Sequence, residues 1–252
     1  MDNLNLKYFL HSCCDANTAP TTDQQKGFPP PDPQAEVPEG TKLIKLIHPG
    51  AFSIGDFPVR EAIENRISRR QYKNLPISFE AFSYLLWATQ GVREEIVHPH
   101  GKGITTFRTA PSAGARHPFE TRILVNKVQG LEQGLYHYMA IGHKIYMEKP
   151  GRDMAVSINN ACFGQFITNC AAAFIWTTIP YRMEWRYGAR RSPKLIAIDV
   201  GHVCQNLYIA AESIQLGVCA LGAYNQEQMD EIIGVDGEKE FVIYLATVGF
   251  AS

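Results

Sequence analysis

Two continuous runs of apolar residues, 171–179 and 241–248, constrain the fold of this chain more than any other feature. Each run has the length of a β-strand and lacks the alternation of apolar and polar residues that marks a strand with one solvated face. Strands of this kind are buried on both faces of a sheet. We therefore expect a central sheet with helices on both of its sides.

A long apolar segment, residues 199–216, lies between these two runs. Its apolar side chains recur at helical spacing, and Gly217 is predicted to end the helix. Polar side chains are scarce along it, so this helix must be buried on nearly every side. It is either a central core helix or a helix that packs on its own sheet and on a second subunit.

The remaining elements complete the predicted fold. Alternating apolar residues predict three strands of an antiparallel meander, at 121–126, 134–139 and 144–148. Helices are predicted over 57–66 with Asp56 as the N-cap, over 78–88 with Ser78 as the cap and Gly91 at the end, and over 226–233. Strands and helices without strict alternation indicate an α+β fold with a central, mostly antiparallel sheet flanked by helices.

The first 42 residues differ in composition from the rest of the chain. Residues 15–40 are rich in Pro, Asp, Gln, Thr and Glu, and such a segment buries too little apolar area to offset the entropy of ordering it. We expect residues 1–42 to form an extended or disordered arm, laid across a partner subunit or used for docking. Residues 43–252 are then one folded domain.

Charge and cysteine content exclude several classes of protein. The chain has 24 Lys+Arg against 25 Asp+Glu, which argues against a nucleic-acid-binding surface or a polybasic membrane anchor. No apolar run is long enough to span a bilayer, and the first residues match a signal peptide poorly. The six cysteines contain no C-x-x-C pair. We expect a cytoplasmic protein with reduced thiols and neither membrane nor nucleic acid as a partner.

One candidate binding motif is Arg66-Ile67-Ser68-Arg69-Arg70. In an extended chain, residues 66, 68 and 70 share a face, so two guanidinium groups and a hydroxyl lie close together. Two permanent positive charges with planar donors suit a phosphate dianion. The alternative interpretation is a solvated basic end of the preceding helix.

Two further segments contain mostly small residues. The first runs from Thr109 to Pro118, where the sequence Pro-Ser-Ala-Gly-Ala-Arg-His-Pro allows backbone to approach a flat ligand closely. The second, residues 219–224, follows the long helix and leaves backbone N–H groups available. Both could also be ordinary surface loops. The chain has no dinucleotide fingerprint and no P-loop. His98 and His100 lack obvious partners, so we predict no metal site.

In this order, the motifs resemble the nitroreductase-like flavoprotein family and, more narrowly, its SagB-type dehydrogenase branch, which includes the azoline dehydrogenases of peptide tailoring. The residues that carry the resemblance are Arg66-x-Ser68-x-Arg70, the segment from Pro111 to Pro118, Asp199-x-Gly201-His202-x-x-Gln205-Asn206-Leu207 and Gly217-x-x-x-Leu221-Gly222. The resemblance covers residues 57 to 250, and the arm lies outside it.

The resemblance implies an obligate homodimer that holds FMN at the subunit interface. Arg66, Ser68 and Arg70 would bind the ribityl phosphate. The other subunit would line the isoalloxazine with Pro111, Ser112, Ala113 and Gly114, with Arg116 nearby. Leu221, Gly222 and Ala223 would present backbone amides to the flavin, and the long helix would form much of the dimer interface.

The implied activity is ping-pong electron transfer. NADH or NADPH binds transiently and donates hydride to flavin N5, and a small electron-poor acceptor such as a nitroaromatic or a quinone then occupies the same site. The alternatives are oxidation of an azoline in a peptide and a non-catalytic flavin-binding partner protein. No catalytic residue is assigned, although Arg186 and Tyr187 are candidates on the substrate side.

Two departures from the family pattern bear on these expectations. Family members often have a further basic residue after the last strand, whereas this sequence has Phe250-Ala251-Ser252, so that phosphate contact is predicted to be missing or replaced. Azoline dehydrogenases carry a Lys-Tyr pair as their base, roughly where this chain has Arg186-Tyr187. An arginine is a poor general base because its pKa stays above about 12.

Overall fold

The centre of the computed structural model, which describes residues 21–98 and 103–252, is a seven-stranded sheet. Its strand order is β1-β6-β5-β4-β7-β9-β8, and every neighbouring pair is antiparallel. A separate hairpin is formed by β2 and β3. The strands are β1 (Ile44–Lys45), β2 (Val92–Val97), β3 (Ile104–Arg108), β4 (Phe119–Val125), β5 (Gly134–Met139), β6 (Lys144–Pro150), β7 (Ala172–Thr178), β8 (Gly217–Leu221) and β9 (Phe241–Gly249).

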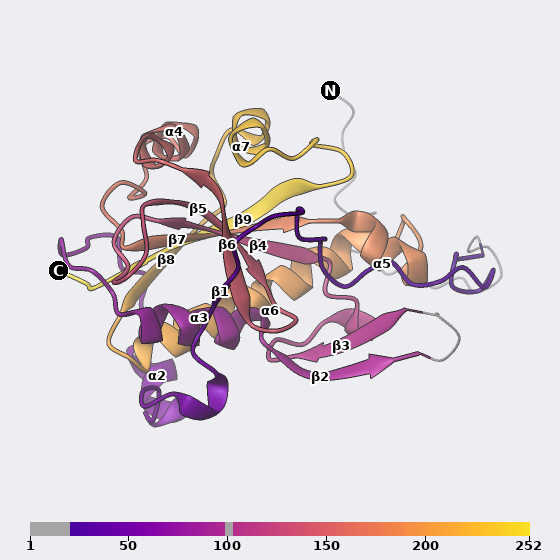
Figure 1. Ribbon diagram of the computed structural model, residues 1–252, viewed down its shortest axis with the longest axis horizontal. Helices are drawn as coiled ribbons and strands as arrows, with labels where there is room; N and C mark the ends of the chain where they lie inside the picture. Colours follow the sequence, from indigo (N-terminus) through magenta and orange to yellow (C-terminus); the bar gives the residue numbers. More distant parts are fainter. Residues whose placement is uncertain (1–20, 99–102) are drawn as a thin grey trace.

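Helices cover both faces of this sheet. The α-helices of the described residues are α2 (Val59–Asn65), α3 (Phe79–Gln90), α4 (Asp153–Ala161), α5 (Pro180–Tyr187), α6 (Ser192–Glu212) and α7 (Gln226–Ile233). In Figure 1, α3 and α6 lie on one face, α4 and α7 lie on the other, and α5 lies at one end. The predicted α+β architecture is thereby confirmed.

The two faces of the sheet carry two separate apolar clusters. In β4, Phe119 and Ile123 belong to the larger cluster with α3 and α6, while Leu124 belongs to the smaller cluster with α4 and α7. Side chains alternate between the faces along a strand, so β4 contributes to both cores. All residues of β4, β5 and β7 are buried. This burial on both sides is what the continuous apolar run of β7 predicts.

Several predicted elements match the structure closely. Ser78 accepts a hydrogen bond from the Ala81 N–H and caps α3, which ends at Gly91. The meander is formed by β4, β5 and β6, and α7 has the predicted bounds. No helix of the described residues is long and apolar enough to cross a membrane.

Three helix boundaries were predicted wrongly. Helix α2 begins at Val59 with Pro58 as its N-cap, so Asp56 does not cap it. Helix α6 begins at Ser192, seven residues before the predicted start, with a proline in its first turn. It ends at Glu212, so Gly217 does not stop it as predicted: the last turn is closed by the hydrogen bond from the Leu216 N–H to the Ala211 carbonyl.

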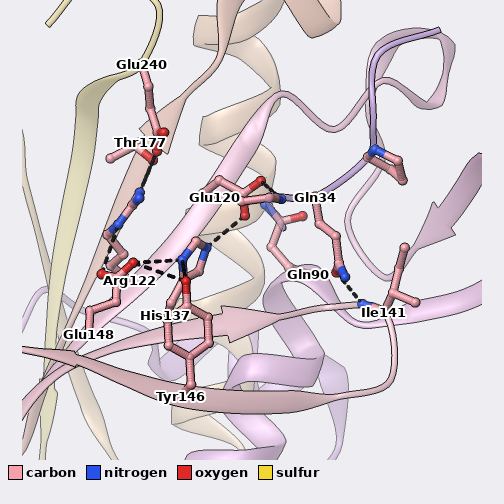
Figure 2. Close-up of polar contacts among 12 residues, drawn as sticks. Gln34, Gln90, Glu120, Arg122, His137, Ile141, Tyr146, Glu148, Thr177 and Glu240 are labelled. Atoms are coloured by element: carbon pink, nitrogen blue, oxygen red, sulfur yellow. Dashed lines mark hydrogen bonds and ion pairs between the residues drawn. The ribbon is translucent and has the colours of Figure 1, made fainter. Parts of the chain in front are cut away.

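Residues 33–35 of the N-terminal arm lie against the sheet of the same chain. The buried Arg108 guanidinium donates to the Pro33 carbonyl at 2.6 Å, and the Ala35 N–H donates to Glu120 Oε1 at 2.8 Å. Gln34 Oε1 accepts from the Ile141 N–H at 2.9 Å (Figure 2). This part of the arm therefore supplies partners to two buried charged side chains.

Glu120 belongs to a polar cluster with Arg122, His137 and Glu148 (Figure 2), in which Glu120, Arg122 and His137 are buried. His137 Nε2 lies 3.0 Å from Glu120 Oε2, and His137 Nδ1 lies 2.9 Å from Glu148 Oε1. Burial lowers the pKa of His137, but the hydrogen bonds to both carboxylates outweigh it and raise the pKa. Burial raises the pKa of Glu120, but the charge of Arg182 and the contacts with His137 dominate and lower it to about 2.

Candidate functional site

The predicted phosphate-binding segment lies along β8 at the edge of the sheet. Ser68 pairs with Val218 as a parallel bridge, and the Arg69 N–H donates to the Val218 carbonyl at 2.9 Å. A Cβ on Gly217 would lie only 2.8 Å from the Arg69 Cβ. The segment can approach the strand this closely because Gly217 has no side chain.

Tyr208 of α6 joins this segment to β8. Its hydroxyl accepts a hydrogen bond from the Ala220 N–H at 2.8 Å and lies 3.0 Å from the Ser68 hydroxyl. The Arg66 guanidinium lies over the Tyr208 ring, 5.4 Å from its centroid. Tyr208 was not among the predicted site residues, although a phenol on an otherwise apolar helix is a signal for a specific polar contact.

The guanidinium groups of this segment differ in their partners. Arg69 pairs with Glu212 at 3.4 Å, whereas neither Arg66 nor Arg70 forms an ion pair with a carboxylate within residues 21–98 and 103–252. Burial raises the pKa of Cys219 in β8, and the nearby charge of Arg70 opposes that rise. Arg66, Ser68 and Arg70 thus present two positive charges and a hydroxyl beside β8, a donor set suited to a phosphate.

The predicted amide-bearing segment begins at the end of the same strand. Leu221 is the buried last residue of β8, and the exposed Gly222 and Ala223 follow it. A Cβ on Gly222 would meet nothing nearer than the Tyr244 ring at 3.9 Å. The structure therefore brings Leu221, Gly222 and Ala223 to the same sheet edge as the arginine pair, with open space beside the backbone.

The loop from Pro111 to Pro118 is held by side-chain hydrogen bonds. The Ala113 N–H donates to the Asp199 carboxylate at 3.1 Å, and Ser112 Oγ accepts from the His117 N–H at 2.9 Å. Burial raises the pKa of Asp199, and its hydrogen bonds with the Ser112 side chain and the Ala113 N–H oppose the rise. Gly114 has a φ of 59°, which favours glycine. Pro111 and Gly114 are exposed, so the loop presents backbone to the exterior.

The two candidate substrate-side residues lie against this loop. A Cβ on Gly114 would lie 2.7 Å from Cδ of Arg186 and 2.7 Å from the Tyr187 hydroxyl. Arg186 is exposed and Tyr187 is half-buried at the end of α5.

Arg116 lies beneath the same loop and is only 8% exposed. Its guanidinium donates to the Gly114 carbonyl at 3.1 Å and to Thr105 Oγ1 at 3.3 Å. It also lies over the Trp185 ring, 5.0 Å from the centroid. Trp185 was not among the predicted site residues, because an aromatic residue in a short helix carries no signal of what it contacts.

The two groups of predicted site residues are far apart within one chain. The loop is anchored at Asp199 near the start of α6, and the arginine segment is anchored at Glu212 at its end. Thirteen residues of helix separate these anchors, which at 1.5 Å per residue is about 20 Å. One chain therefore does not unite Arg66, Ser68 and Arg70 with Pro111, Ser112, Ala113 and Gly114.

Metal-binding residues are not clustered in the described ranges. His98 Nε2 lies 2.9 Å from Thr105 Oγ1, and His100 lies outside the described residues. No group of three or more His, Cys, Asp or Glu side chains there could hold a metal ion. Cys162, Cys170, Cys204 and Cys219 are buried free thiols, and Cys13 and Cys14 lie outside the described residues.

A family model described as the nitroreductase family matches residues 63–250, which include both halves of this candidate site. The chain belongs to the nitroreductase family. It is therefore an oxidoreductase, and its mixed fold with a mostly antiparallel sheet is the fold of solved members.

Known proteins resemble the chain over most of its length. A protein named as a nitroreductase, MJ1384 of Methanocaldococcus jannaschii, is 30% identical over 199 residues, 78% of this chain and 92% of its own length. The trifolitoxin-processing protein TfxB of Rhizobium leguminosarum bv. trifolii is 24% identical over 158 residues, 60% of this chain and 42% of its own length.

Solved structures share the fold at lower identity. A nitroreductase-like protein of Anabaena variabilis has a TM-score of 0.67 and 23% identity, with 87% of this chain and 45% of that chain covered. This chain thus spans about half of that protein. A chain of the Escherichia coli microcin synthetase McbBCD complex has a TM-score of 0.60 and 16% identity, with 87% and 84% covered.

Proposed function

We propose that the protein is an FMN-dependent oxidoreductase that passes electrons from NADH or NADPH to a small electron-poor acceptor, in ping-pong order. The observation that carries the proposal is the donor set beside β8: Arg66 and Arg70, which have no carboxylate partner among the described residues, the Ser68 hydroxyl, and open backbone after Leu221. These groups suit the phosphate and the polar edge of FMN. When bound, FMN supplies the two-electron redox chemistry, and the protein positions it.

The separation of the two groups of site residues supports a dimer. The Pro111–Gly114 backbone of one copy would complete the site beside the arginines of a second copy. An exposed apolar patch accompanies this arrangement, since Val59 and Ile63, one turn apart on α2, are 65% and 60% exposed. Apolar side chains gathered in this way are typical of a protein interface.

A second candidate function is oxidation of an azoline in a peptide, as in the SagB-type dehydrogenase branch. The similarity to TfxB and to the McbBCD complex favours it, as does the position of Arg186 and Tyr187 against Gly114. Arg186 would have to orient the substrate, because its guanidinium does not release a proton. Tyr187 is then the residue that can exchange one.

The proposal is tested by the FMN affinity of an Arg66→Ala and Arg70→Ala double variant. Loss of two charge-assisted contacts is expected to weaken FMN binding by about 3–6 kcal/mol, which fluorescence titration of the flavin measures. Arg60→Ala is the matched control, because Arg60 is an exposed arginine of α2 outside the donor set, and it should bind FMN normally. Unchanged affinity in the double variant contradicts the proposal.

The two candidate functions differ in the reductant that should bleach the FMN-loaded protein under anaerobic conditions. NADH or NADPH should bleach it if the proposed function holds, and a nitroaromatic or a quinone should then restore the colour. A heterocyclised peptide should bleach it in place of the nicotinamide if the chain oxidises azolines. Bleaching by neither reductant rejects both functions.

A further inference from the structure

A cavity lies beside the Pro111–Pro118 loop, and the N-terminal arm forms one of its walls. Its volume is about 1010 Å³. The arm contributes Phe28 and Pro30, the β2–β3 hairpin contributes Phe107, and α5 contributes Trp185. A cavity with apolar and aromatic walls and a few polar groups is the usual form of a small-molecule site.

Trp185 fixes the arm to the floor of this cavity. Its indole Nε1–H donates to the Phe28 carbonyl at 3.0 Å, and its own carbonyl accepts from the Gln24 N–H at 2.9 Å. The Trp185 ring also contacts the Arg116 guanidinium, which lies over it. The arm wall and the cationic floor are therefore connected through one residue, and the cavity depends on both.

The charged groups that line the cavity are cationic. Arg116 and Arg186 both face it, and no Asp or Glu of the described residues is among its lining side chains. Neither guanidinium forms an ion pair with a carboxylate in the described ranges. Burial and the neighbouring charge of Arg186 lower the pKa of Arg116. An anion between them would relieve this repulsion and replace water that burial has removed.

We propose that this cavity binds the acceptor substrate and selects flat aromatic acids, with the carboxylate at Arg186 and Arg116 and the ring against Phe28, Phe107 and Trp185. This inference rests on the proposed function for the role of the ligand as acceptor. The arm is then a specificity-determining wall supplied by the same chain. Gly114 lines this cavity and is itself exposed, so an acceptor held there would lie next to the part of the loop where the flavin is proposed to lie.

The test compares an aromatic acid with its neutral analogue. Isothermal titration of the FMN-loaded protein with 2-naphthoate and 2-naphthamide should show about tenfold tighter binding of the acid, about 1.4 kcal/mol. Arg186→Met keeps the apolar stem and should reduce the preference, because it removes one of the two charges and leaves Arg116. Phe28→Ala should weaken both ligands equally and keep the preference. Both side chains are exposed, so neither change should unfold the protein.

Arg152→Met is the control for loss of an exposed arginine, since Arg152 lies away from this cavity and should leave both affinities unchanged. Equal binding of acid and amide overturns the inference, as does wild-type behaviour of Arg186→Met. Absence of binding by the loaded protein overturns it too, because flavin would then fill the cavity. Selective binding of 2-naphthoate without bleaching by NADH or NADPH rejects the proposed function alone.

Discussion

At the scale of single residues, the buried carboxylate of Glu120 connects the most parts of the molecule. It contacts Arg182 of α5, His137 of β5 and the Ala35 N–H of the arm. Its pKa of about 2 lies well below the ordinary 4.5, so its stabilising contribution is complete above pH 4.5 and declines as the pH falls toward 2. His137 has the opposite effect on the pH dependence of stability, because its pKa is raised. Its stabilising contribution is complete below pH 6.5 and declines as the pH rises through the pKa of the folded state.

Glu120→Gln should therefore remove a pH-dependent part of the stability. Near neutral pH we expect a loss of about 3–5 kcal/mol in unfolding free energy, because Arg182 is left without its charged partner. Between pH 6 and pH 3.5 the difference from wild type should shrink by about 1.4 kcal/mol, as protonation of the unfolded carboxylate removes its advantage. Urea unfolding followed by tryptophan fluorescence at both pH values measures this. If the difference in unfolding free energy between Glu120→Gln and wild type does not change with pH, the pKa of Glu120 is not lowered in the folded state.

At the scale of secondary-structure elements, the close approach of residues 66–70 to β8 depends on a single glycine. Gly217→Ala would place a Cβ 2.8 Å from Cβ and Cδ of Arg69. We expect the segment to shift, with a loss of about 1–3 kcal/mol in unfolding free energy and weaker FMN binding. Thermal unfolding and flavin titration measure the two effects.

Gly222→Ala is the stability control for this change, because a Cβ there meets nothing nearer than 3.9 Å. It should unfold at the wild-type temperature. If Gly217→Ala also unfolds at that temperature and binds FMN normally, the segment does not need to lie so close to the strand.

The elements that the sequence predicts well are those with local signals. Ser78 caps α3 through its own hydroxyl, and β7 is recognisable because its apolar run is continuous. The missed elements lack such signals. Strand β8 is short and begins with glycine, so its sequence does not indicate a strand. Its strand conformation comes from pairing with β9. Asp56 is a favourable cap residue, but α2 begins after Pro58 instead.

The candidate site was predictable in its residue types and not in its arrangement. The spacing of Arg66, Ser68 and Arg70 suits an anion site, although the sequence alone leaves a solvated basic helix end as the alternative. Nothing local shows that Tyr208, 140 residues after Ser68, holds the segment, or that the arm lies on its own chain through Trp185. Such contacts depend on how distant elements pack.

At the scale of the whole molecule, the length of α6 separates the two halves of the proposed flavin site by about 20 Å. If the active unit is a dimer, each site takes its arginine half from one copy and its loop half from the other. A C2 interface then produces two equivalent sites per dimer. A monomeric site would instead need the loop to leave Asp199, which holds the Ala113 N–H at 3.1 Å.

Paired variants distinguish these arrangements. One chain carries Arg66→Ala and Arg70→Ala, and the other carries Pro111→Trp, an exposed position where a bulky side chain should block the loop half. Two different tags allow the mixed dimer to be purified. If the two copies share each site, this dimer has one intact site and one doubly defective site, and it should bind about one FMN. Each variant alone should bind almost none. A mixed dimer of wild type with a chain carrying all three substitutions should bind almost none, because each of its sites receives one defective half. Sites contained within single chains would reverse both results.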